Sequence, residues 1–120
     1  MAWKLTVRAG PIVERSRHDK LDDALDALEA RAKELVKDAT GQAVDLRFRR
    51  FEPVEQVVAR IELSGPERLM PRVRAGVDIR GDGSTEAYLG HLKRDVIEER
   101  RGDTTYRALR RALASSLQPQ

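Results

Sequence analysis

The stretch that decides the fold is LDDALDALEARAKELV, residues 21–36. Its apolar residues recur every three or four positions and form one stripe along an α-helix: Leu21, Ala24, Leu25, Leu28, Ala32, Leu35 and Val36. Asp19 is a suitable N-cap and Gly41 a suitable stop, so we expect the helix to run from about residue 20 to 39. A helix with a single apolar stripe needs an apolar surface to cover.

That surface is expected to come from β-strands, because polarity alternates every second residue on both sides of the helix. Strands are predicted at residues 3–13, 44–48, 57–63, 73–80 and 88–97. The first is interrupted at Gly10-Pro11, where we expect a bend or bulge, at a sheet edge or between two short strands. The segments 44–48 and 57–63 flank a turn at Glu52-Pro53 and are expected to pair as a hairpin.

The stretch VDIRGDGSTEAYLG, residues 77–90, carries several oxygen-bearing side chains around two glycines. A calcium loop would need a different spacing and flanking helices, which this segment lacks. Asp82-Gly83 between two alternating segments favours a hairpin turn, since such turns need residues that tolerate positive φ. We therefore interpret residues 81–84 as a turn.

The chain ends in a second, shorter helix, with Asp103 as its expected N-cap and a narrow stripe at Leu109, Leu113 and Leu117. The predicted fold is α+β with the order β-α-β-β-β-β-α. We expect a curved antiparallel sheet of four to five strands with the long helix packed on one face and the short C-terminal helix beside it or at one end. Residues 1–117 are expected to form one domain, and residues 118–120 a frayed tail.

Composition excludes several classes of function. The 120 residues include no cysteine, so disulfides, thiolate metal sites and cysteine nucleophiles are ruled out. The N-terminus lacks the apolar segment of a signal peptide, and no later segment is apolar for long enough to cross a bilayer. These features predict a cytoplasmic protein that does not span a membrane.

Residues suited to catalysis are sparse. His18 adjoins Asp19 before the long helix, where a capping cluster and a catalytic pair are the two interpretations, and His91 stands alone. The serines do not lie in a strand-turn-helix elbow, and no glycine pattern precedes a helix in the way a phosphate loop requires. We predict no catalytic residue, no metal site and no cofactor, and a small enzyme using dispersed histidines and carboxylates is the third functional hypothesis.

Arginine is the most informative residue type, because 18 of the 23 basic residues are Arg and the net charge is +3. Arg offers planar, bidentate contacts to carboxylates and phosphates. The candidate ligand-binding or phosphate-binding residues lie on the polar sides of the strands and on the last helix: Arg47, Arg49, Arg60, Arg72, Arg74, Arg80, Arg107, Arg110 and Arg111. Acidic neighbours such as Glu62 and Asp78 partly neutralise this surface, and an antiparallel sheet needs a polar outer face in any case.

Apolar residues outside the main stripes are the second candidate surface: Leu69, Met70, Val54, Val58 and Ile97. Because an open sheet also leaves an unpaired edge, we expect a homodimer or a protein partner. The first hypothesis is therefore a small, non-catalytic binding or protein-interaction module that self-associates. Binding of an anionic ligand or a nucleic acid through the Arg-rich face is the alternative, although the few aromatic residues do not favour nucleic acid.

Overall fold

The structure is a computed structural model and describes residues 2–45, 56–66, 73–90 and 94–117. Its elements in chain order are β1 (Trp3–Ala9), β2 (Ile12–His18), α1 (Leu21–Asp45), β3 (Val57–Ser64), β4 (Arg74–Arg80), β5 (Thr85–Leu89), β6 (Asp95–Val96) and α2 (Thr105–Leu117). The strands form one antiparallel sheet in the order β2-β1-β3-β4-β5-β6. The predicted α+β fold is confirmed, with six strands rather than four to five.

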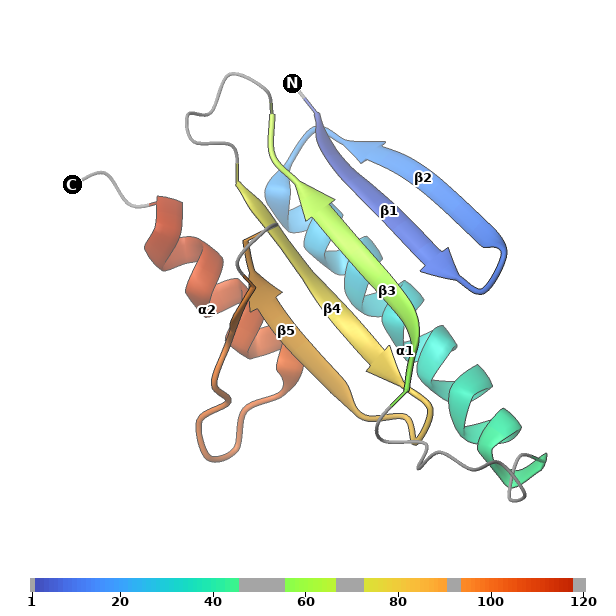
Figure 1. Cartoon of the computed structure of the whole chain (residues 1–120). Helices are drawn as coiled ribbons and strands as arrows, with labels where there is room; N and C mark the ends of the chain where they lie inside the picture. The colour runs from blue at the N-terminus through green and yellow to red at the C-terminus, as the bar shows by residue number, and fades with distance from the viewer. Residues whose placement is uncertain (1, 46–55, 67–72, 91–93, 118–120) are drawn as a thin grey trace.

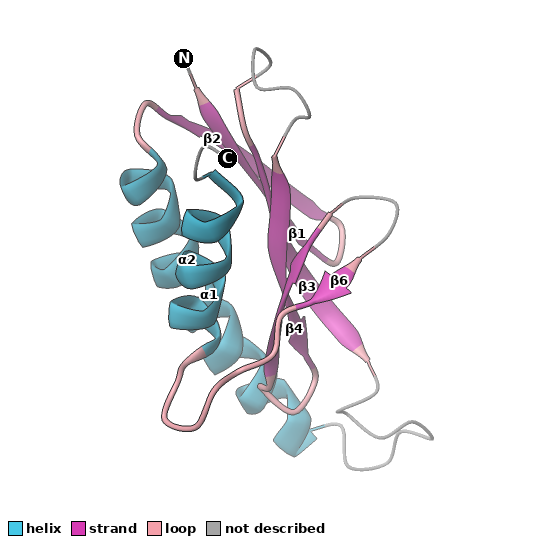
Figure 2. Cartoon of the chain, turned by 90° about the vertical axis from the view of Figure 1, so that its left-hand side faces the viewer, coloured by secondary structure: helices cyan, strands magenta, loops and turns pink. Residues whose placement is uncertain are grey.

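Both helices cover the same face of the sheet, as Figure 2 shows. The apolar stripe of α1 meets the inward side chains of β1, β3 and β4, so that Leu28, Ile61 and Val77 are almost fully buried. Burial of each such side chain stabilises the fold by about 2 kcal/mol. The opposite side of the sheet, which we call the open face, is not covered by either helix (Figures 1 and 2).

The first two strands form a hairpin rather than one strand with a bend or bulge, so Gly10-Pro11 lies between two short strands, which was one of the expected positions. Ala9 pairs with Ile12, so Gly10 and Pro11 are a two-residue loop between β1 and β2. Gly10 has a φ of +59°, the positive value that the first position of a type II′ turn requires, and Pro11 follows with its fixed negative φ. The hairpin places β2 at one edge of the sheet (Figure 1).

The long helix extends past its predicted stop. It continues through Gly41 to Asp45, so the strand expected at residues 44–48 begins inside a helix, and its remainder lies outside the described residues. A helical Gly costs only about 1 kcal/mol relative to Ala, and packing of the preceding turns outweighs that cost. The expected hairpin with residues 57–63 is also wrong, because β3 pairs with β1 on one side and β4 on the other.

The turn at residues 81–84 is confirmed, since β4 and β5 pair across it and Gly83 has a φ of +87°. The Asp82 carboxylate accepts hydrogen bonds from the Ser84 N–H (2.9 Å) and hydroxyl (2.6 Å), which hold the pKa of Asp82 below its ordinary value. The single strand expected at residues 88–97 is instead the end of β5 and the whole of β6. These two short strands lie on either side of Gly90 in the sequence and pair with each other.

The C-terminal helix packs beside α1, with its Arg110 guanidinium 2.8 Å from the Asp26 carboxylate. Its N-cap is Thr104 rather than the predicted Asp103: the Thr104 hydroxyl accepts from the Arg107 N–H (3.1 Å), and its carbonyl accepts from Ala108. In the described part of the chain, neither helix is long and apolar enough to cross a membrane.

Candidate functional site: a basic cavity on the open face

The strand register arranges the open-face side chains in rows that cross the sheet. The first row contains Arg17, Lys4, Ser64 and Arg74. The second contains Arg15, Thr6, Glu62, Gly76 and Tyr88. The third contains Val13, Arg8, Arg60, Asp78 and Glu86. Since neighbouring strands are about 4.8 Å apart, residues far apart in sequence become direct neighbours in each row.

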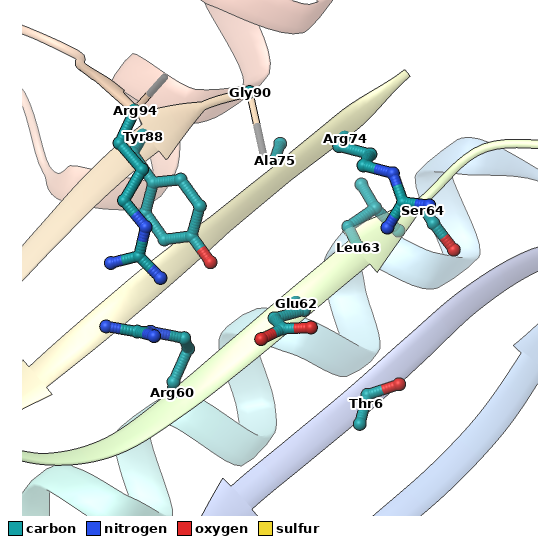
Figure 3. Close-up of a pocket in the computed structure, with 10 residues that line it drawn as sticks. All are labelled: Thr6, Arg60, Glu62, Leu63, Ser64, Arg74, Ala75, Tyr88, Gly90 and Arg94. Carbon is teal, nitrogen blue, oxygen red and sulfur yellow. The ribbon is translucent and has the colours of Figure 1, made fainter. Parts of the chain in front are cut away.

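A cavity of about 220 Å³ lies on the open face, among side chains of all three rows. Cationic and hydroxyl side chains line most of it: Arg60, Arg74, Arg94, Thr6, Ser64 and Tyr88, with Glu62 as the acidic member. Figure 3 shows these side chains on the open face, with the helices behind the sheet. The cavity therefore gathers residues from β1, β3, β4 and β5 and the segment before β6.

Tyr88 forms one wall of the cavity. Its ring lies over Gly76, where an added Cβ would collide with the Tyr88 hydroxyl and would lie 2.5 Å from the carbonyl oxygen of Ile61. Tyr88 is only 5% exposed, and this burial raises its pKa to about 12. Its hydroxyl points into the cavity and stays protonated at neutral pH, so it is available as a hydrogen-bond donor (Figure 3).

Two of the three arginines are held in place by one buried carboxylate. Asp78 is 6% exposed, and its oxygens lie 2.6 Å from Arg60 Nε and 3.2 Å from Arg94 Nη1. The hydrogen bond to Asp78 is the main reason why the pKa of Arg60 lies above its ordinary value. The Arg94 guanidinium also stacks 4.5 Å from the centroid of the Tyr88 ring. Both guanidinium groups are therefore held in fixed orientations at the cavity wall.

Arg74 differs from the other arginines of this face. Within the described ranges its guanidinium has no acidic partner, whereas Arg80 pairs with Glu86 at 3.1 Å and Arg8 with Glu62 at 3.7 Å. Arg74 lies across the cavity from Arg60 and Arg94 (Figure 3). Among the described residues, Arg74 thus forms no ion pair on its side of the cavity and faces two arginines that share Asp78, while the one acidic residue of the lining, Glu62, pairs with Arg8.

The structure separates the arginines that the sequence grouped together. Arg60 and Arg74 line the cavity, and Arg80 lies on the same face but pairs with Glu86. Arg107, Arg110 and Arg111 belong to α2, on the opposite side of the sheet, where Arg110 and Arg111 pair with Asp26 and Asp103. The remaining three, Arg47, Arg49 and Arg72, lie outside the described residues.

Of the described residues that line the cavity, only Arg60 and Arg74 were candidates from the sequence; Tyr88 and Arg94 were missed, as was Gly76, over which the Tyr88 ring lies. A glycine inside an alternating strand is a signal for close approach of another group, and Gly76 carried that signal. Tyr88 was assigned only to a strand, and Arg94 had no distinguishing pattern. Their meeting depends on the register between β4 and β5.

The predicted apolar surface is divided. Val58 and Ile97 are half-buried against the core, and Val54, Leu69 and Met70 lie outside the described residues. The large apolar side chains that are exposed in the described part are Ile12, Val13, Val57 and Val96.

The two histidines do not come together. His18 Nε2 lies 3.0 Å from the Ser16 hydroxyl, an interaction within β2, and His91 is not among the described residues. In the part of the chain that the structure describes, no three His, Asp or Glu side chains are placed to hold a metal ion.

Comparison of the chain with models of known families, with curated proteins and with solved structures found no match. The function is therefore inferred from the residues of the site.

Proposed function

We propose that this protein is a small, non-catalytic binding module that holds an anionic group, a carboxylate or a phosphate, in the cavity of the open face. The observation that carries the proposal is Arg74, whose guanidinium faces Arg60 and Arg94 across the cavity without an acidic partner among the described residues. An oxyanion between these groups would satisfy charges that the protein leaves partly uncompensated.

The donors around the cavity suit an oxyanion. Each guanidinium has five N–H groups, so Arg60 and Arg94 keep free donors beyond those that bond Asp78. Arg donors form strong, charge-assisted hydrogen bonds with carboxylate and phosphate oxygens. The Tyr88 hydroxyl adds a neutral donor, and Ser64 and Thr6 line the cavity beside it.

The size of the cavity limits the ligand. At about 220 Å³ it is smaller than the pockets that enclose whole drug-sized ligands, so it fits one anionic group. The rest of a larger ligand would lie along the open face. A free small anion and an anionic group on a partner molecule share this chemistry.

Nucleobase recognition is less well supported than anion binding. Bases of single-stranded nucleic acids need accessible aromatic faces on which to stack. One face of Tyr88 carries Arg94, and its ring also lies over Gly76. Of the other aromatic residues described, Trp3 is in the core, and Tyr106 lies under Lys33 at 5.8 Å.

Titration with inorganic phosphate and with citrate, followed by calorimetry and amide NMR shifts, tests the proposal. We expect Arg74→Ala to weaken binding about tenfold, since a charge-assisted hydrogen bond contributes roughly 1.5 kcal/mol or more. Arg107→Ala is the matched control, because it removes the same charge from an exposed position on α2, on the other side of the sheet. Equal losses in the two variants would show that only net charge matters and would contradict a built site.

Salt and ligand type give a second measurement. A single oxyanion in the cavity predicts shifts at Gly76, Tyr88 and Arg94, with a weak dependence on ionic strength. A single-stranded oligonucleotide is the comparison ligand, and tighter binding of the oligonucleotide with a steep salt dependence would favour the nucleic-acid alternative.

Self-association and a cytoplasmic location stay predictions. The exposed Val57 and Val96 are apolar side chains at which a second copy of the chain would find contact. Such a dimer leaves the cavity accessible if it uses the β6 edge, since that edge lies beyond β5.

A further inference from the structure

The outer edge of β2 is the longest unpaired strand edge among the described residues. β2 runs for seven residues, Ile12–His18, and pairs only with β1. At the other edge β6 is only two residues long. Long edges are commonly protected by a bulge, a proline or charged side chains. The β1–β2 register is continuous and residues 12–18 contain no proline, so β2 carries charged side chains but neither of the two backbone devices.

The hydrogen bonds of the sheet show which residues of β2 point outward. The carbonyl of Arg74 accepts from the N–H of Gly90 (2.9 Å), so even-numbered residues of β4 bond toward β5. Bonding direction alternates along an antiparallel strand, so odd-numbered residues of β4 bond toward β3. The Gly65 N–H, which donates to the Val73 carbonyl at 2.7 Å, agrees with this assignment.

The same alternation carries across the sheet. In β3, the odd-numbered residues hydrogen-bond to β4 and the even-numbered residues to β1. In β1, the even-numbered residues therefore hydrogen-bond to β3, and the odd-numbered residues hydrogen-bond to β2. The partners of the odd-numbered β1 residues are even-numbered residues of β2. Val13, Arg15 and Arg17 therefore direct their N–H and C=O groups away from the sheet.

The side chains of these outward residues lie on the open face, because they stand opposite Arg8, Thr6 and Lys4 of β1. Arg15 and Arg17 are exposed, and neither has an acidic partner in the described part of the chain. Lys4, the next residue in the row of Arg17, likewise lacks an acidic partner among those residues. As far as the described residues show, the edge thus combines backbone groups without a strand partner and positive charges without an acidic partner.

A second copy of β2 fits this edge poorly. Two-fold antiparallel pairing would bring outward residues opposite outward residues. The registers of greatest overlap place Arg15 opposite Arg15, Arg15 opposite Arg17, or Glu14 opposite Glu14. Like charges directly opposite each other destabilise a strand pair, so the edge discriminates against self-pairing.

We propose that the β2 edge binds an extended acidic segment of another protein, which adds to the sheet as a further antiparallel strand beside Ile12–His18. Backbone groups of Val13, Arg15 and Arg17 hold the added strand. Acidic side chains at alternate positions of the partner lie on the open face against Arg15 and Arg17. On the other side of the sheet the partner meets Ile12, which is 54% exposed, so an apolar residue suits that end.

A short peptide that alternates Glu and Thr is the probe, and the same peptide with Lys in place of Glu is its control. We expect the Glu peptide to bind and to slow hydrogen exchange at the amides of Val13, Arg15 and Arg17. The amides of Glu14 and Ser16, which already bond β1, should change little. This alternating pattern distinguishes strand addition from unspecific attraction of a negative peptide.

Charge reversal tests the recognition. Arg15→Glu/Arg17→Glu should weaken the Glu peptide about tenfold and create binding of the Lys peptide, since two exposed ion pairs each become repulsive. Arg101→Glu/Arg107→Glu is the matched control, because it changes the net charge equally at exposed positions outside the open face. Arg74→Ala should leave peptide binding at the β2 edge intact, so that failure of the anion cavity and failure of this edge are separable.

A backbone variant completes the test. Val13→Pro removes an outward donor without removing a bond to β1 and should weaken the Glu peptide about fivefold relative to Val13→Ala. The proposal is overturned if the outward amides gain no protection, if both peptides bind equally, or if the two double variants lose the same affinity. It is also overturned if these amides are protected in the free protein in a concentration-dependent way, because a second copy then occupies the edge.

Discussion

At the scale of single residues, Gly76 makes room for the Tyr88 ring, which forms one wall of the cavity. It is the position in the second row without a side chain, and Tyr88 fills the space above it. The Asp78 carboxylate then orients Arg60 and Arg94 beside that ring. One missing side chain and one buried charge therefore fix the positions of the Tyr88 ring and of two guanidinium groups at the cavity.

Gly76→Ala should destabilise the protein by about 1–3 kcal/mol, because its Cβ meets both Tyr88 and the Ile61 carbonyl oxygen at 2.5 Å or less. Urea unfolding measures the loss, and phosphate titration should show weaker binding as Tyr88 is displaced. Gly102→Ala is the control: nothing lies within 4 Å of its Cβ, but its φ of +85° adds strain. It should lower stability without changing phosphate binding. Unchanged binding in Gly76→Ala would contradict the placement of Tyr88.

Tyr88 should titrate far above an ordinary tyrosine, whose pKa is about 10. Because the folded pKa is about 12, the native state keeps the phenol proton while the unfolded chain loses it. The associated stability is present below about pH 10 and is lost as the pH rises toward 12, by roughly 2–3 kcal/mol at most.

Phenolate absorbance in a Tyr106→Phe background isolates Tyr88, since the chain has two tyrosines and burial raises the pKa of Tyr106 as well. Tyr88→Phe should lack this component of alkaline destabilisation. A phenolate midpoint near 10 in the folded protein would show that the ring is not buried at the cavity wall.

At the scale of elements, the two proposed binding sites depend on the edges of the sheet and on the position of α1. β1 and β2 form a hairpin at Gly10-Pro11, which turns what the sequence suggested was one interrupted strand into an edge with free backbone groups. α1 runs from Leu21 to Asp45 behind β1, β3 and β4 (Figure 1), which leaves the opposite face for the cavity.

Gly41→Ala distinguishes a continuous α1 from a helix that stops at Gly41. In a helix interior the substitution should stabilise the protein by about 0.5–1 kcal/mol, since Ala has the higher helix propensity. At a left-handed C-cap it would destabilise by a similar amount. Thermal unfolding with far-ultraviolet circular dichroism measures both stability and helix content, and a lower melting temperature would contradict the helix through Asp45.

At the scale of the whole molecule, the two helices and the open face divide the charged residues into two sets. Arginines of α2 pair with Asp26 and Asp103 in the helical layer, whereas Arg60, Arg74 and Arg94 belong to the open face. The Arg-rich surface expected from the sequence is therefore two surfaces. Of these two described sets, the open-face set surrounds a cavity with hydroxyl donors.

Homodimerisation is tested on the whole chain by sedimentation velocity. A dimer predicts a mass about twice 13.6 kDa at high protein concentration. Self-pairing of β2 would place like charges opposite each other, so we expect a dimer to form at the β6 edge instead. Val96→Lys, at an exposed position of β6, should then return the mass toward that of the monomer. A mass near 13.6 kDa for the unaltered protein at the highest concentration would rule out the dimer.

The sequence by itself determined the α+β class, the apolar stripe of α1 and the Asp82-Gly83 turn, because each depends on local periodicity or on the conformational freedom of one residue. It also placed Arg60 and Arg74 on polar strand faces. The tertiary structure decided that β3 lies beside β1, that Tyr88 covers Gly76, and that Asp78 binds Arg60 and Arg94. These contacts depend on strand order and register, and a periodic pattern specifies which face a side chain takes but not which strand lies beside it.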